Sequence, residues 1–180
     1  MLAPDFTYHP FEELRPVQPK NIEVLEFWKK LRGEAKLPLW SDFDPLDIIN
    51  HLTNSMMVHC ESKESTRIIL FGTRLVETIG IDLTGMNFLD VFDDSEKPHS
   101  IERTYALRSR PAAGLTKFIG KAANGSPFEA EVVTLPFAND DGSIDRLLLS
   151  VTEYIYDRNH PNSVFVVNKK NLDDYRFYDL

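Results

Sequence analysis

The sequence predicts an α+β domain in which one five-stranded antiparallel sheet carries helices on one face, preceded by an N-terminal helical extension. Two strand-like segments joined by a polar loop predict a hairpin at residues 55–71, and three longer segments joined by short turns follow at 115–154. Apolar residues at helical spacing predict two helices between them. With 180 residues, the chain is long enough for one domain with short extensions.

Residues 1–40 are predicted to form an arm and an amphipathic helix. Four of the eleven prolines fall within residues 1–20, which argues against long regular structure there. The helix has Asn21 as its expected N-cap and Gly33 as its end. Its apolar stripe must pack on something, and we treat it as a candidate dimer face: Val24, Phe27, Trp28 and Leu31.

A second helix start is predicted at Asp44, an N-cap residue followed by Pro45 at the first helical position. The nearby aspartates Asp42 and Asp47 also suggest a calcium loop. That signature fails because Leu46 stands at the third ligand position and no glycine follows at the sixth. Capping is the better interpretation.

The predicted sheet begins after residue 54, and residues 41–156 are assigned to it and its helices. Strands are expected at Ser55–Cys60 and Thr66–Phe71, then a short helix at Thr73–Ile79, and a longer helix from Ser95 or Ser100 to Arg110. Three further strands are expected at Leu115–Ala122, Phe128–Phe137 and Ile144–Tyr154. Asn124-Gly125 predicts a type I′ hairpin turn between the first two of them. Residues 157–180 are a C-terminal extension with one candidate strand at Val164–Val167.

Composition excludes several classes of protein. Hydrophobic residues make up 42% of the chain and charged residues 27%, which is typical of a globular domain and not of a disordered one. Twenty Lys and Arg against 28 Asp and Glu give a net charge of −8, so we expect no nucleic-acid partner. Cys60 is the single cysteine, which excludes an internal disulfide.

We expect a cytoplasmic protein with no membrane partner. The N-terminus lacks the basic and apolar regions of a signal peptide. The longest stretch without Asp, Glu, Lys or Arg is residues 48–60, which is too short to cross a bilayer.

The stretch Leu70–Gly80, continued by Ile81–Phe92, resembles the strand, short helix and glycine-punctuated linker of PAS domains. The turns Asn124-Gly125-Ser126 and Asp141-Gly142-Ser143 resemble those that flank the penultimate PAS strand. The resemblance runs from about residue 42 to residue 154. The helix bearing Trp28, with the Asp-x-Asp-Pro motif ending at Pro45, is similar to a bacterial subfamily in which this domain is almost the whole protein.

The resemblance implies a sheet in strand order 2-1-5-4-3 with a pocket between sheet and helices, which in many members holds a small ligand, haem or flavin. Members usually sense or dimerise, and they do not usually catalyse. The chain shows no output module of its own, so we expect it to act on a separate signalling protein, with a homodimer as an alternative.

Candidate pocket residues come from the two helices and the strands. Arg103 and Tyr105 are candidate polar anchors, with a solvated Arg103 and a core Tyr105 as the competing interpretation. An apolar row is also what a packed core requires. The candidate walls are Leu75, Ile79, Phe92, Tyr105, Phe118 and Leu149.

The cofactor remains unknown from the sequence. In photoactive flavin-binding members the linker has the pattern Gly-x-Asn-Cys. Here Phe88 follows Gly85-Met86-Asn87, which excludes a cysteinyl–flavin adduct at that position. Haem-binding members use a histidine on the long helix, for which His99 is the candidate, although its polar neighbours argue against haem. We expect Cys60 to be an inert core residue.

Catalytic and metal-binding motifs are absent from the sequence, so the chain is not expected to be an enzyme or a metal protein. The leading hypothesis is a sensory module that binds a small ligand or a protein partner. The alternatives are a ligand-free dimerisation module and a small cone-shaped α+β hydrolase or isomerase, for which Asp90 and His99 are the pair to test.

Overall fold

The computed structural model describes residues 6–155 and 174–180. Its three α-helices are α1 (Pro19–Arg32), α2 (Thr73–Ile79) and α3 (Lys97–Ser109). The short 3-10 helices are η1 (Phe11–Glu13), η2 (Trp40–Asp42), η3 (Pro45–Ile48), η4 (Leu52–Asn54) and η5 (Phe88–Val91). The strands are β1 (Tyr8–Pro10), β2 (Ser55–Cys60), β3 (Thr66–Phe71), β4 (Ala112–Lys121), β5 (Pro127–Ala138), β6 (Ile144–Ile155) and β7 (Asp174–Asp179).

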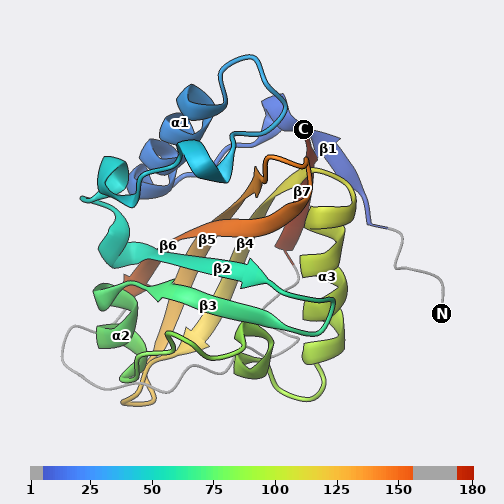
Figure 1. Ribbon diagram of the computed structural model, residues 1–180. Helices are drawn as coiled ribbons and strands as arrows, with labels where there is room; N and C mark the ends of the chain where they lie inside the picture. The colour runs from blue at the N-terminus through green and yellow to red at the C-terminus, as the bar shows by residue number, and fades with distance from the viewer. Residues whose placement is uncertain (1–5, 156–173) are drawn as a thin grey trace.

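The sheet has seven strands in the order β1-β7-β4-β5-β6-β2-β3 (Figure 1). The five strands predicted from the sequence lie together in the predicted order, with β2 and β3 as the first two. The prediction missed β7, which pairs antiparallel with β4, and β1, which pairs parallel with β7. A three-residue strand such as β1 is too short to show a hydrophobic period.

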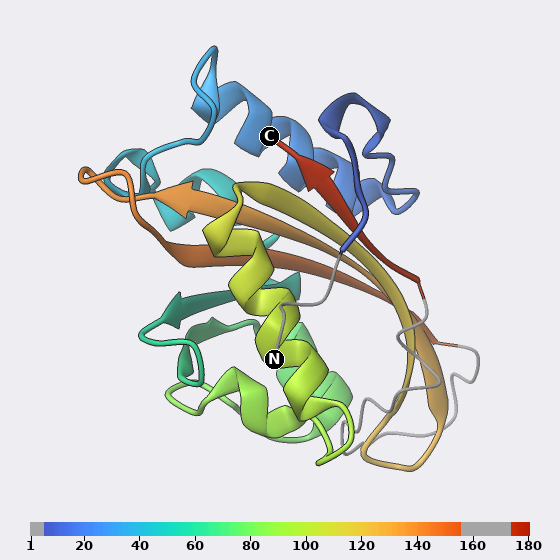
Figure 2. The ribbon, with the colours of Figure 1, turned by 90° about the vertical axis from the view of Figure 1, so that its right-hand side faces the viewer.

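Helices cover both faces of the curved sheet, as Figure 2 shows. The concave face holds α2, η5 and α3, as predicted for the helices within residues 41–156. The convex face is covered by α1 and by the segment that contains η2. The prediction of helices on one face is therefore correct for the helices that follow the hairpin, and the N-terminal extension covers the other face. Each face has its own cluster of buried apolar side chains.

The stripe on α1 packs within the chain, against the convex face. Val24 and Trp28 are 0% exposed, and the Trp28 indole N–H donates to the carbonyl of Pro136 at 3.0 Å. Phe27 and Leu31 are half-buried against the same cluster. The prediction of a dimer face is therefore wrong for Val24 and Trp28, because the sheet already covers them.

Asn21 is not the N-cap of α1. The cap position is Gln18, and Asn21 is buried inside the helix, where its amide donates to the backbone carbonyl of Glu131 at 3.0 Å. The Glu131 carboxylate accepts from the backbone N–H groups of Val17 and Gln18 at 3.0–3.1 Å. Asn21 Oδ1 accepts from Ser150 and is thereby tied to β6. We call Asn21 and Glu131, with the contacts that they make, the α1 clamp.

Several local predictions are confirmed. Asp44 accepts a hydrogen bond from the N–H of Leu46 at 2.9 Å, and Pro45 begins the helix, although that helix is a single 3-10 turn. The hairpin strands and α2 have the predicted bounds, and Gly80 ends α2 with a positive φ of 80°. The candidate strand at Val164–Val167 lies outside the described residues.

Candidate functional site

A cavity of about 130 Å³ lies between the concave face of the sheet and the elements α2, η5 and α3. Its wall is mostly apolar. The strands contribute Met56, Val58, Phe71, Thr116, Phe118, Phe128, Val132, Thr134, Leu147, Leu149, Val151, Glu153 and Tyr175. The helices and the linker contribute Leu75, Thr78, Ile79, Leu83, Phe88, Val91, Phe92, Ser100, Arg103, Thr104 and Leu107.

Local structure explains why these side chains converge. On α3 the cavity residues Ser100, Arg103, Thr104 and Leu107 follow the i, i+3, i+4, i+7 pattern of one helix face. On β6 every second residue from Leu147 to Glu153 points to the cavity, as strand geometry requires. The sequence periodicity therefore defines most of the wall.

Six of the eight candidate pocket residues line the cavity: Leu75, Ile79, Phe92, Arg103, Phe118 and Leu149. His99 and Tyr105 do not. Each lies one residue away from the cavity face of α3, and a step of one residue turns a helix by roughly 100°. His99 is exposed, and Tyr105 is 42% exposed with the Lys63 ammonium 5.0 Å from its ring centroid. The structure thus removes both from the candidate site.

Arg103 is neither free in the cavity nor solvated. Both of its terminal nitrogens donate to Glu96 Oε2 at 3.3 Å, and Glu96 is fully buried. The guanidinium also lies 5.6 Å from the ring centroid of Tyr175 on β7. Burial raises the pKa of Tyr175 to about 12, against the opposing effect of Arg103, so this phenol stays neutral.

Two hydroxyl groups near this end of the cavity lack hydrogen-bond partners in the described part of the chain. They are Ser100 Oγ on α3 and Thr116 Oγ1 on β4, and both residues are buried. A buried hydroxyl without a partner costs free energy that a ligand or a water molecule can recover. The sequence gives no signal for Thr116, because its partner strand β7 was not predicted.

Glu153 on β6 contributes the carboxyl group of the cavity wall. Its side chain is 3% exposed, its Oε2 is contacted by the hydroxyl of Thr78, and its Oε1 has no partner among the described residues. Burial raises the pKa of this carboxyl above its ordinary value of 4.5, and the Thr78 hydrogen bond and then Arg74 partly offset the effect. Sequence analysis missed Glu153, because an acidic residue near a strand end usually faces solvent.

The described cavity wall offers neither an axial ligand for haem nor the cysteine of a photoactive flavin site. Haem needs an axial ligand, but no histidine lines the described cavity wall, and His99 is on the surface. Phe88, at the position of the photoactive cysteine, contacts Phe92 edge-on with ring centroids 5.2 Å apart.

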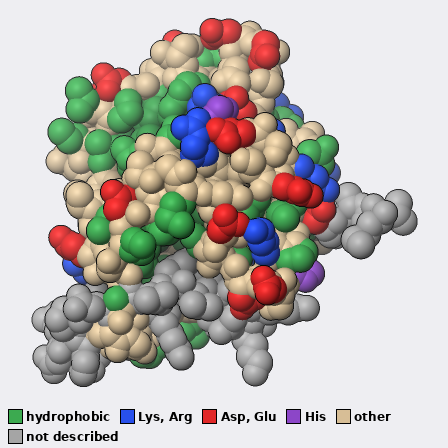
Figure 3. Space-filling model, turned by 60° about the horizontal axis from the view of Figure 1, so that its bottom comes forward, with side chains coloured by type: hydrophobic (Ala, Val, Ile, Leu, Met, Phe, Trp, Pro, Cys, Tyr) green, Lys and Arg blue, Asp and Glu red, His purple; other side chains and the backbone are tan. Residues whose placement is uncertain are grey.

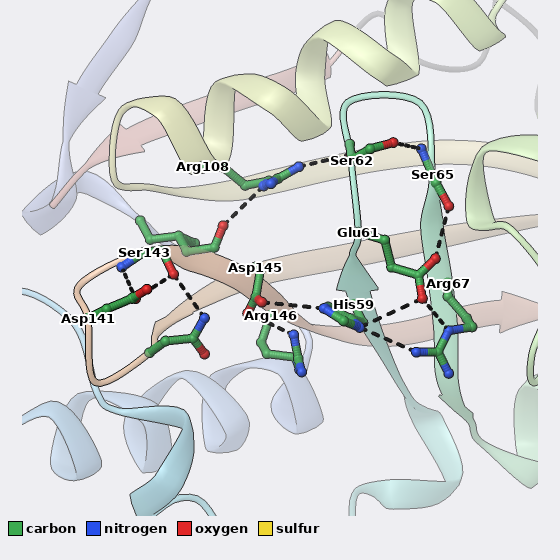
Figure 4. Close-up of polar contacts among 12 residues, drawn as sticks. His59, Glu61, Ser62, Ser65, Arg67, Arg108, Asp141, Ser143, Asp145 and Arg146 are labelled. Atoms are coloured by element: carbon green, nitrogen blue, oxygen red, sulfur yellow. Dashed lines mark hydrogen bonds and ion pairs between the residues drawn. The ribbon is translucent and has the colours of Figure 1, made fainter.

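The candidate catalytic pair is not assembled. Asp90 accepts from Lys97 Nζ at 2.5 Å, no contact joins it to His99 in the described residues, and neither residue lines the cavity. Figure 4 shows a different histidine, His59, between Asp145 and Glu61. Its Nε2 is 3.3 Å from the Asp145 carboxylate, and Arg67 donates to Glu61 at 2.6 Å. These contacts join the ends of neighbouring strands.

Charged side chains are mixed on the surface. On the face shown in Figure 3, acidic, basic and hydrophobic groups are interspersed. Among the described residues there is no group of three or more His, Cys, Asp or Glu side chains that could hold a metal ion. None of the described helices is both long enough and apolar enough to span a bilayer.

Comparisons with solved structures find LOV domains at low sequence identity. A fungal LOV domain photoreceptor is 16% identical, with a TM-score of 0.43 over 64% of this chain and 94% of that one. The LOV protein of Rhodobacter sphaeroides is 14% identical, with a TM-score of 0.47 over 65% of this chain and 72% of that one. Among curated proteins, none matches this sequence significantly.

The family assignment comes from the sequence match. A model of the PAS domain family matches residues 17–151, which is three quarters of the chain and includes α1, the hairpin, α2, α3, β4, β5 and most of β6. The strand order and the cavity agree with the resemblance noted in the sequence. The chain therefore belongs to the PAS domain family.

Proposed function

We propose that this chain is a sensory module that binds a small ligand in the cavity between the sheet and the helices and signals to a separate protein. The observation that supports this proposal is a cavity of about 130 Å³ whose wall carries buried polar atoms without partners in the described residues: Ser100 Oγ, Thr116 Oγ1 and Glu153 Oε1. A packed core rarely leaves three such atoms around one void.

The cavity volume limits the ligand to a compact molecule. An engineered protein cavity of about 150 Å³ lined by apolar side chains accommodates benzene, so a ligand with a body of that size fits here. The apolar wall provides the hydrophobic free energy of binding, and the polar atoms select the substituents. PAS domains usually sense and do not catalyse, and we propose that no reaction takes place in this cavity.

Native mass spectrometry of the purified protein tests the proposal directly. A bound mass above that of the chain, released on denaturation, is the expected result. A thermal shift of at least a few degrees with a compact ligand is the second expected result, because ligands stabilise the state that binds them. The proposal is refuted if no bound mass is found and no compound in a library of compact metabolites raises the melting temperature.

A further inference from the structure

The Glu153 carboxyl is the most unusual group in the cavity wall. It is almost fully buried, and only its Oε2 is contacted by a protein donor, the Thr78 hydroxyl. Oε1 is buried and has no partner within the described residues. A charged oxygen in this situation is costly, because burial removes the water that would otherwise solvate it.

Nearby cations compensate this carboxylate only weakly. The nearest guanidinium atom, Arg74 Nε, is 4.0 Å away, and Arg74 Nη1 donates to Glu77 at 3.2 Å. Arg74 is about half exposed, so water also screens its charge. Lys20, farther along the same side, donates to Asn54 Oδ1 at 2.6 Å. Glu153 and Glu77 thus share one guanidinium, which leaves an excess of negative charge.

Oε1 is a hydrogen-bond acceptor when the carboxyl is ionised. The Thr78 hydroxyl contacts both the Arg74 carbonyl, at 3.0 Å, and Glu153 Oε2, yet it has one hydrogen to donate. It donates to Oε2 when Glu153 is ionised. When Oε2 carries the proton, the carboxyl donates to Thr78 and the hydroxyl donates to Arg74. In the ionised carboxyl Oε1 carries no proton, so a partner for it must be a donor.

The other charged group of the wall, Arg103, already has a counterion. Arg103 donates twice to the buried Glu96, and its guanidinium faces the ring of Tyr175. A ligand therefore meets a paired charge at Arg103 and a poorly paired carboxyl at Glu153. The remaining wall includes apolar side chains such as Leu149 and Phe118.

We propose that the ligand is a small organic ammonium compound, with a compact apolar body of about the size of benzene and an N–H group that donates to Glu153 Oε1. This inference rests on the proposed function. A monocation supplies both the missing donor and the missing countercharge, and a charge-assisted hydrogen bond is roughly twice as strong as a neutral one. An alcohol supplies only the donor, and a carboxylate supplies neither.

Isothermal titration at pH 7 with three ring compounds of matched size tests the proposal: cyclopentylamine, cyclopentanol and cyclopentanecarboxylate. We expect the amine to bind at least about tenfold more tightly than the alcohol, and the carboxylate to bind more weakly than both. In Glu153→Gln the preference for the amine should fall below about threefold. The matched control is Glu129→Gln on β5, an exposed carboxylate that does not line the cavity and should leave the preference unchanged.

The outcomes separate this inference from the proposal beneath it. Equal binding of the alcohol and the amine, or an unchanged preference in a folded Glu153→Gln variant, would overturn the ammonium assignment. The proposal that the cavity binds a small ligand would still stand. If no ring compound binds and native mass spectrometry finds no bound mass, both proposals fail. The ranking in the wild-type protein decides the question even if the variant does not fold.

Discussion

The α1 clamp predicts a large loss of stability when the Glu131 side chain is truncated. This residue is 0% exposed on the convex face, and its carboxylate accepts from two backbone N–H groups that precede α1 and from the Asn21 amide. Lys117 Nζ lies 3.9 Å away at the rim and is half exposed. The helix start therefore has its hydrogen-bond acceptor on β5, more than a hundred residues away in sequence.

The magnitude for Glu131→Ala follows from the groups left without a partner. Each buried donor deprived of its acceptor costs about 1–3 kcal/mol, and the N–H groups of Val17 and Gln18 both lose theirs. The substitution also removes a buried methylene, worth about 0.8 kcal/mol. Water can reach Val17, which is exposed, so we take the lower part of the range and expect a loss of about 3–5 kcal/mol.

Glu131→Gln separates the hydrogen bonds from the charge. Its amide oxygen can keep the Oε1 contacts with Val17, Gln18 and Asn21, while the charge assistance is lost. We expect a cost of about 1–2 kcal/mol, well below that of Glu131→Ala. Glu129→Ala, at an exposed position on the same strand, should change stability by no more than about 0.5 kcal/mol.

Urea denaturation followed by circular dichroism measures these differences. With a slope of about 2 kcal/mol per molar urea, Glu131→Ala should lower the midpoint by roughly 2 M. Hydrogen exchange should also accelerate at the Val17 and Gln18 amides in both Glu131 variants. A loss below about 1 kcal/mol for Glu131→Ala, or unchanged exchange at these amides, would show that the clamp does not hold α1.

Three further predictions concern other sites. Because burial raises the pKa of Glu153, the folded state binds a proton more tightly than the unfolded state, and wild-type stability should fall as pH rises above about 4.5. Glu153→Gln should lack this fall, and parallel stability–pH profiles of the two proteins would contradict the argument. Gly72→Ala should lower the free energy of unfolding, measured by urea denaturation, by about 3 kcal/mol, because its Cβ would lie 2.4 Å from two backbone oxygens. Gly33→Ala, at φ 55° in open space, should lower it by about 1 kcal/mol, and equal losses would refute the steric reasoning. Burial raises the pKa of Cys60 to about 11. At pH 8 its thiol should therefore react with a disulfide reagent slowly in the native protein and rapidly in urea, and fast labelling of the native protein would contradict this.

Periodicity and turn chemistry were sufficient to predict much of the fold. The bounds of β2, β3 and α2 follow from alternation, a polar loop and Gly80, all of which act over a few residues. The sequence could not predict that β7 would pair with β4, because that pairing joins segments more than fifty residues apart. The same limitation explains the error on α1: an amphipathic stripe predicts burial, but not whether its own sheet or a second chain buries it.

The apolar wall of the cavity was also more predictable than its polar groups. Leu75, Ile79 and Leu149 are apolar at the right period, and any core-facing residue would satisfy that pattern. Arg103 and Glu96 pair locally, within α3 and its N-cap, but their burial, and the lack of a partner for Glu153 Oε1 in the described residues, depend on tertiary packing. A single sequence carries no local signal for a missing hydrogen-bond partner, so the groups that we consider selective for the ligand appear only in three dimensions.

Strands β5 and β6 contribute side chains both to the α1 clamp and to the cavity wall. On β5, Glu131 belongs to the α1 clamp and the next residue, Val132, lines the cavity; on β6, Thr152 donates to Asn21 and the next residue, Glu153, lines the cavity. Successive side chains on a strand point to opposite faces, so the cavity and α1 are separated by the thickness of one sheet. Glu131 and Thr152 are directly opposite each other in the register of these strands, so the contacts that hold α1 and the wall of the cavity depend on the same pair of strands.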